Sequence, residues 1–125
     1  MTKGRKPSSI TTGTQPVRQV PRPPAWLSSD AKAEWRRAVP SLVERRLLDV
    51  ADLASLENYC VAQGRVREIE RQIQATGFDP ALDRAQQKAM QTARQLAALF
   101  GLTPADRSRP TIRDGADDDE LAFLG

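Results

Sequence analysis

The sequence predicts an all-α protein in which a short N-terminal helix precedes a long antiparallel helical hairpin, with disordered segments at both ends. Apolar residues recur three and four positions apart through the middle of the chain, which is the spacing of one helix face. No stretch alternates between apolar and polar residues as a convincing strand would. A chain of 125 residues is long enough for one domain and too short for two.

The first helix is expected to begin near Ser29, because the hydroxyl of Ser28 or Ser29 can accept a hydrogen bond from a free amide of the first turn. Asp30 follows at a position where the helix dipole favours an acid. The apolar face of this helix consists of Ala31, Trp35, Ala38, Val39 and Leu42. Pro40 lies inside the pattern and predicts a kink or a break, since proline removes one backbone hydrogen bond.

The second helix is expected to begin at Asp49 or Val50, with Asp49 as its cap, and to end at Gly77 in a left-handed cap. A helix of about 27 residues is roughly 40 Å long and needs a partner along its length. Its apolar stripe consists of Leu53, Leu56, Tyr59 or Cys60, Val66, Ile69 and Ile73.

The third helix is expected to begin at Asp79–Pro80, with proline in the first turn, and to end at Gly101 with an apolar contact from Leu102. Its alanine-rich face consists of Leu82, Ala85, Ala89, Ala93, Leu96, Ala97 and Phe100. The short connection between the last two helices predicts an antiparallel hairpin. Because only 5% of residues are aromatic, we expect part of the stability to come from contacts between subunits.

The largest apolar side chains of these helices are expected in the core or in a subunit interface: Trp35, Leu42, Leu53, Leu56, Tyr59, Ile69 and Phe100. Trp26 lies beside Pro23 and Pro24. We expect it to hold the N-terminal segment against the bundle or against a neighbouring subunit.

The net charge of +3 is modest, but the charges are unevenly distributed. Residues 1–24 contain no acid and five cations, Lys3, Arg5, Lys6, Arg18 and Arg22. The C-terminal stretch is acidic through Asp114, Asp117, Asp118, Asp119 and Glu120. This asymmetry predicts two different partners and a division into a basic, proline-rich flexible arm (1–25), a helical domain (26–109) and an acidic-hydrophobic tail (110–125).

The composition excludes several kinds of catalytic site. The chain has no histidine, a single cysteine and no glycine-rich phosphate loop, so it cannot build a Ser-His-Asp triad, a His-ligated zinc site or the usual ATP cradle. The acids at 117–120 could supply oxygen ligands, but nothing fixes their geometry, so we expect no metal and no cofactor. With no membrane-spanning apolar run and no signal peptide, we expect a soluble intracellular protein.

Several short motifs resemble one known family. Gly4-Arg5-Lys6-Pro7 stands near the start, and Gly101-Leu102-Thr103-Pro104 with Arg107 follows the last predicted helix. Between them lie further matching positions, Pro21, Pro24, Leu27, Trp35, Leu42, Asp52, Leu56 and Tyr59. In this order the motifs resemble the small terminase subunits of tailed phages, in particular the P27 (HK97-like) group. The chain departs from the pattern in a short loop after Gly77 and in Arg46-Leu47-Leu48, where a glycine is often expected.

The resemblance implies a non-enzymatic protein of the host cytoplasm that forms a homo-oligomeric ring and binds double-stranded viral DNA. It also implies regulation of a separate large subunit that holds the ATPase and nuclease. The candidate DNA-binding residues are Lys3, Arg5, Lys6, Lys32, Arg36, Arg37, Arg45 and Arg46. The candidate docking residues for the large subunit are Leu121, Phe123 and Leu124.

Three alternatives remain open from the residues themselves. The first is a small dimeric transcriptional regulator that binds a palindromic operator. The second is an all-helical enzyme of the chorismate-mutase kind, which would need buried arginines converging on a pocket. The third concerns the tail alone, which could compete with DNA for the basic surface instead of docking on a partner.

Overall fold

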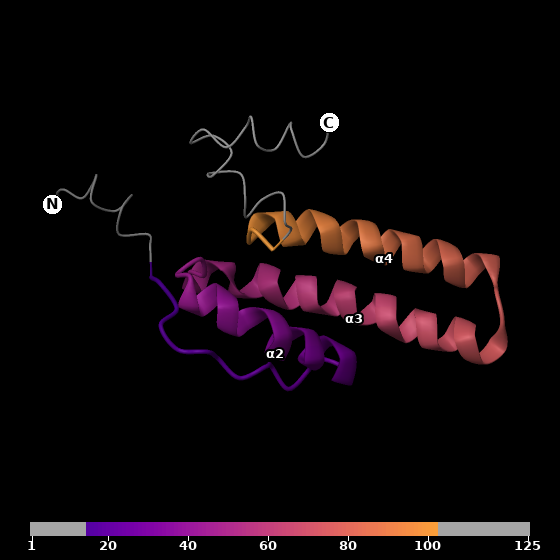
Figure 1. The fold of residues 1–125 in the computed structure, drawn as a ribbon, viewed down its shortest axis with the longest axis horizontal. Helices are drawn as coiled ribbons and strands as arrows, with labels where there is room; N and C mark the ends of the chain where they lie inside the picture. The colour runs from indigo at the N-terminus through magenta and orange to yellow at the C-terminus, as the bar shows by residue number, and fades with distance from the viewer. Residues whose placement is uncertain (1–14, 103–125) are drawn as a thin grey trace, which may run out of the picture.

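The computed structural model describes residues 15–102, which are all-α as predicted (Figure 1). The elements are α2 (Ser29–Glu44), the 3₁₀ helix η2 (Val50–Asp52), α3 (Leu53–Thr76) and α4 (Pro80–Leu99). Within this range there is no β-strand, and the β pairing consists of one isolated bridge between Pro16 and Asp49. Of the two ends predicted to be flexible, 1–25 and 110–125, residues 1–14 and 110–125 lie outside the described range. Residues 15–25 lie inside it, where the Val17 amide donates to the Leu48 carbonyl and the Pro21 carbonyl accepts from the Trp35 indole.

Helix α2 begins where the sequence predicts. The Ser28 hydroxyl accepts a hydrogen bond from the Ala31 amide at 3.1 Å, and Asp30 lies in the first turn. The helix continues through Pro40 to Glu44, so the expected break does not occur. Pro40 is exposed, and water can therefore satisfy the carbonyl that loses its amide donor.

The start of the long helix is confirmed at Asp49, but its first turn is a 3₁₀ helix. Asp49 and Asp52 form a reciprocal capping box. The Asp49 carboxylate accepts a hydrogen bond from the Asp52 backbone amide, and the Asp52 carboxylate accepts one from the Asp49 backbone amide. Helix α3 then runs for 24 residues, or about 36 Å, and ends before Gly77. Gly77 has the expected positive φ of 95°, but its ψ of 170° is extended, so the predicted left-handed cap is wrong in detail.

Helix α4 returns antiparallel to α3 and completes the predicted hairpin (Figure 1). The Asp79 carboxylate caps it through the amides of Ala81 and Leu82, and Pro80 occupies the first turn. At its other end the Leu102 amide donates to the Ala97 carbonyl at 3.1 Å, as in a Schellman motif. The predicted stop around Gly101 is confirmed.

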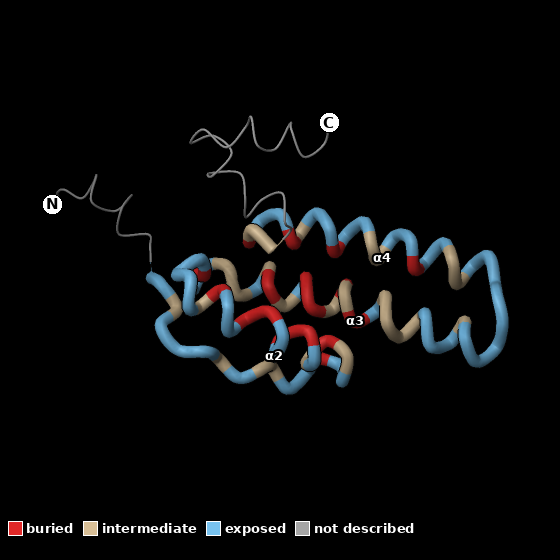
Figure 2. Tube along the Cα trace, viewed as in Figure 1, coloured by how far each residue is buried: buried red, intermediate tan, exposed pale blue. Residues whose placement is uncertain are grey.

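The core lies where α2 covers the first half of α3 and the end of α4 meets them (Figure 2). Trp35, Leu42, Leu56, Tyr59 and Phe100 are buried there, as predicted. Leu53 and Ile69, in contrast, are only half-buried. For Ile69 the reason is geometric: α2 has 16 residues and α3 has 24, so the hairpin extends beyond the helix that covers it. Leu53 lies at the first residue of α3 and packs against the edge of the core.

The far half of the hairpin therefore keeps an incompletely covered apolar stripe. Val66, Ile69, Ile73 and Leu82 are half-buried, and Phe78 at the tip is 72% exposed. Figure 2 shows this end mostly in the intermediate and exposed colours. The pattern agrees with the expectation that subunits contribute to one another's stability, which remains a prediction.

Gly64 lies where α2 and α3 approach closely. A Cβ atom placed on it would lie 2.8 Å from the Ala31 backbone nitrogen and 3.1 Å from its Cα. We expect Gly64→Ala to lower the free energy of unfolding by about 1–3 kcal/mol, because rigid backbone must move apart. Urea unfolding followed by circular dichroism measures this loss.

The matched control for this prediction is Gln72→Ala, which places the same alanine on an exposed position of the same helix. Its effect should stay within about 0.5 kcal/mol. Helix propensity alone favours alanine over glycine by about 1 kcal/mol. A Gly64→Ala protein as stable as the control would therefore contradict the proposed contact.

Candidate nucleic-acid interface

The N-terminal segment is fastened to the corner between α2 and η2. The Gln15 amide donates to a carboxylate oxygen of Asp49 at 2.5 Å, and the Gln15 carbonyl accepts from the Val50 amide at 2.9 Å. The Val17 amide donates to the Leu48 carbonyl at 2.9 Å. These bonds fix the point from which residues 1–14 depart.

Three exposed cations belong to the segments that meet there, Arg18 on the anchored segment and Arg45 and Arg46 at the end of α2, and we call them the basic corner. Arg18 and Arg46 line one small hollow of about 210 Å³, together with Pro16 and Val17. All three side chains belong to exposed residues, and none forms an ion pair within residues 15–102. The structure thus brings the predicted Arg46 together with Arg18, which the sequence had placed only in the arm, while Arg45 precedes Arg46 at the C-cap of α2.

Arg46 occupies an unusual backbone conformation. Its φ is 58°, the left-handed region, which costs a residue with a Cβ about 1–2 kcal/mol. The chain turns here because the Leu47 amide donates back to the Leu42 carbonyl at 2.9 Å. Arginine therefore stands at a position where glycine is the ordinary choice, and the side chain it adds is an exposed cation.

The predicted residues of α2 divide into two kinds. Lys32 and Arg36 lie one turn apart and form no ion pair within the described range, and Arg36 is exposed. Arg37 instead binds Glu34, with Nε–Oε1 at 2.9 Å and Nη2–Oε2 at 2.5 Å. Arg37 thus has a structural task that the sequence analysis missed, although 60% of its side chain remains exposed.

Glu34 is fully buried and gathers groups from both helices. Besides Arg37, it accepts a hydrogen bond from the Tyr59 hydroxyl at 2.5 Å and from Arg67 Nη2 at 2.8 Å. Burial opposes its ionisation, but the bonds from Arg37 and Tyr59 and the charges of Arg37 and Arg67 outweigh this, so the pKa of Glu34 is lowered. Burial and the bond to Glu34 together raise the pKa of Tyr59.

A second ion pair joins the same helices at the start of α2. Arg71 donates through both terminal nitrogens to the Asp30 carboxylate, and this bidentate bond is the main reason that the pKa of Asp30 is lowered. The arginines of this face therefore converge on the protein's own carboxylates. They do not converge on a vacant pocket, as the hypothesis of an arginine-lined enzyme site requires.

The predicted N-terminal cations and C-terminal docking residues belong to the two ends of the chain. The candidate residues Lys3, Arg5, Lys6, Leu121, Phe123 and Leu124, and the acids at 117–120, lie outside the described range. Residues 15–102 contain no cluster of three or more acidic, cysteine or histidine side chains able to hold a metal. The single thiol, Cys60, is buried, and burial raises its pKa to about 12. Among the described helices, none is long and apolar enough to cross a membrane.

These features define a small all-α protein in which exposed cations lie at the corner where the described part of the chain begins. A sequence model described as "Phage terminase, small subunit" matches residues 31–117, more than half of the chain. The protein belongs to the phage terminase small-subunit family, and this family acts in phage DNA packaging. Searches of curated proteins and of solved structures found no match.

Proposed function

We propose that this protein is the small terminase subunit that recognises viral DNA at the start of genome packaging and regulates a large subunit. The motifs quoted from the sequence support the P27 (HK97-like) group within its family. It acts in the host cytoplasm as a homo-oligomeric ring and performs no catalysis itself. The ATPase and nuclease chemistry belongs to the large subunit.

One observation carries the DNA-binding part of this proposal: the basic arm starts at the basic corner. Gln15 is fixed to Asp49, and Lys3, Arg5 and Lys6 precede Gln15 by at most 12 residues. They are therefore tethered to the basic corner with its three exposed arginines. At about 3.4 Å per extended residue, Lys3 lies at most about 40 Å from Gln15. Arm and corner can therefore neutralise neighbouring phosphates of one duplex and release their counterions.

Lys32, Arg36 and Arg37 form the second part of the proposed surface. They lie on α2, which leads directly into Arg45 and Arg46. Lys32 and Arg36 are the stronger candidates, since Arg37 already shares its charge with Glu34. Phosphate contacts of this kind position the DNA but do not distinguish one base sequence from another.

Arg46 allows DNA binding to be separated from folding. We expect Arg46→Gly to raise the free energy of unfolding by about 0.5–1 kcal/mol, because glycine accepts a φ of 58° without strain. The same change should weaken DNA binding and reduce the slope of log K against log salt by about 0.9, the value of one phosphate contact. Thermal unfolding and a salt series of fluorescence anisotropy measure the two effects.

Arg46→Gln is the matched control, since it removes the charge and keeps the strained backbone. It should weaken DNA binding as much as Arg46→Gly does, without the gain in stability. Opposite movements of stability and affinity cannot come from misfolding. If both variants bind duplex DNA as well as the unaltered protein, Arg46 does not contact DNA.

The proposed docking of Leu121, Phe123 and Leu124 on the large subunit can be tested by truncation. We expect a chain ending at Thr111 to keep its oligomeric state in native mass spectrometry and to lose the large subunit in a pulldown, because it lacks all three apolar anchors. A full-length control with only these three residues changed to alanine keeps the acids and should lose capture as well. Undiminished capture by either variant contradicts the assignment.

A further inference from the structure

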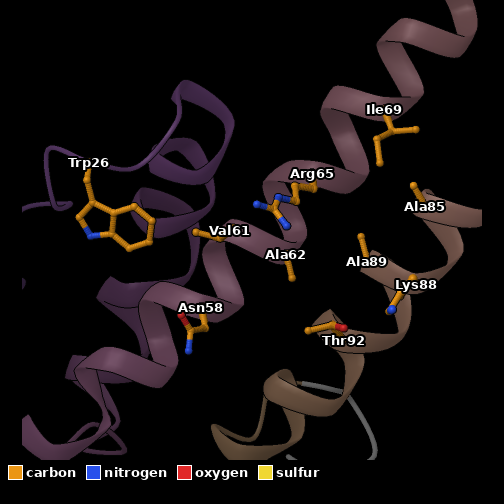
Figure 3. A pocket seen from close by; sticks show the side chains of 10 residues that line it. All are labelled: Trp26, Asn58, Val61, Ala62, Arg65, Ile69, Ala85, Lys88, Ala89 and Thr92. Atoms are coloured by element: carbon orange, nitrogen blue, oxygen red, sulfur yellow. The ribbon is translucent and has the colours of Figure 1, made fainter. Parts of the chain in front are cut away.

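A groove between Trp26, α3 and α4 has no covering element within residues 15–102 (Figure 3). Its volume is about 660 Å³. Val61 and Ile69 line it from α3, and Ala85 and Ala89 line it from α4. Trp26 forms one wall and is 62% exposed, whereas tryptophan is highly buried on average; its indole N–H donates a hydrogen bond to Glu57.

Two cations flank this apolar floor. Arg65 from α3 and Lys88 from α4 both line the groove, and neither forms an ion pair within the described range (Figure 3). Arg84 stands one turn before Lys88 on the same helix. The groove thus combines an apolar floor with positive edges. A suitable occupant presents apolar side chains beside a run of acids.

We propose that the groove binds residues 117–124 of the same chain. This segment places Asp117, Asp118, Asp119 and Glu120 directly before Leu121, Phe123 and Leu124, and it holds the densest run of acids in the sequence. The apolar residues fill the groove between Val61 and Ala89, and the acids lie against Arg65 and Lys88. Exposed ion pairs contribute little individually, so the apolar contacts supply most of the affinity and the charges fix the orientation.

The chain is long enough for this arrangement. Fifteen peptide links separate Leu102 from Asp117, and extended chain spans up to about 3.3 Å per residue, or roughly 50 Å. From the end of α4 back to Ala89 the distance along the helix is about 15 Å. A tether of this length holds the tail at an effective concentration on the order of millimolar, so weak contacts suffice.

The proposal goes beyond DNA binding and does not depend on it. The family match covers residues 31–117, so Leu121, Phe123 and Leu124 lie outside the matched range. The same three side chains are proposed to bind the large subunit. Docking in the groove and docking on the large subunit therefore exclude each other, and the groove holds the tail until the large subunit takes it.

Disulfide trapping in the full chain tests whether residues 117–124 bind in the groove. Thr92 is exposed and lines the groove, so we combine Thr92→Cys with Ala122→Cys and oxidise with glutathione. The control pairs Ala122→Cys with Gln91→Cys, an exposed neighbour that does not line the groove. Cys60 is buried and does not compete. We expect the Thr92 pair to form an intrachain disulfide at least ten times faster than the control pair.

Charge reversal gives a second readout. Arg65→Glu with Lys88→Glu should slow the Thr92 cross-link about tenfold and leave the Gln91 rate unchanged. Equal rates for the two pairs, or cross-links formed only between copies, would overturn the proposal. If a sister subunit covered the groove instead of the tail, the two rates would also be equal, and the proposal would be wrong. DNA affinity and capture of the large subunit play no part in this measurement, so its failure and the failure of the proposed function are distinguishable.

Discussion

Replacing Glu34 by alanine is expected to lower the free energy of unfolding by about 3–5 kcal/mol, the usual cost of removing one partner from a buried charge network. Glu34 is 0% exposed and accepts hydrogen bonds from Arg37, Arg67 and Tyr59. Without the carboxylate, the Tyr59 hydroxyl remains buried without its acceptor, and two guanidinium groups lose their counter-charge. Small domains are stable by only about 5–15 kcal/mol, so this loss is a large part of the total.

Urea unfolding at one fixed protein concentration measures this effect, since subunit association also contributes to apparent stability. Glu44→Ala serves as the control, because Glu44 lies on the same helix, is exposed and forms no ion pair within residues 15–102. Its change should stay within about 0.5 kcal/mol. A Glu34→Ala loss below about 1 kcal/mol would show that Arg37, Arg67 and Tyr59 find equally good partners elsewhere.

The Glu34 carboxylate also predicts how the free energy of unfolding changes as the pH falls. The pKa of Glu34 is lower in the folded protein than its ordinary value of 4.5, since Arg37 and Tyr59 bind the ionised form. Its contribution is therefore fully present above about pH 4.5 and is lost as the pH falls through the folded-state pKa. A Glu34→Gln protein should show a flatter fall of stability in this acidic window. Parallel pH profiles for the two proteins would contradict the assigned role.

The sequence predicted most helix boundaries because caps depend on neighbouring residues. Ser28, Asp49, Asp79 and Pro80 each act within one turn of their own position, so their chemistry can be read locally. The position of α2 along the hairpin cannot be read in this way. That position explains why Ile69 is only half-buried, and it follows from packing between distant residues.

The Glu34 network illustrates the same limit within the candidate site. Tyr59 and Arg67 lie 25 and 33 positions from Glu34, and no local pattern joins them. One signal was present: Glu34 falls between Ala31 and Ala38 on the apolar face of its helix, where an acid needs a buried partner. That signal would have identified Arg37, three residues on, as a structural partner before it was counted as a free cation.

Removal of residues 2–14 is expected to weaken binding to duplex DNA by roughly 100-fold near 0.1 M salt and to reduce the salt slope by about 2.7, if Lys3, Arg5 and Lys6 each neutralise one phosphate. The deletion should end at residue 14, because the bonds that anchor the segment to Asp49, Leu48 and Val50 begin at Gln15. Circular dichroism should therefore show an unchanged helical fold. Fluorescence anisotropy over a salt series gives both the affinity and the slope.

The matched control removes three cations from another part of the molecule. Arg84→Gln, Lys88→Gln and Arg94→Gln all lie on α4 and change the net charge by the same three units as the deletion. If DNA responds only to total charge, the two proteins will lose equal affinity. If the arm and the basic corner form the binding surface, the α4 variant will keep nearly its full salt slope while the deletion loses about three phosphate contacts. An unchanged slope in the deletion would remove the arm from the DNA interface and leave the basic corner with Lys32 and Arg36 as its remaining candidates.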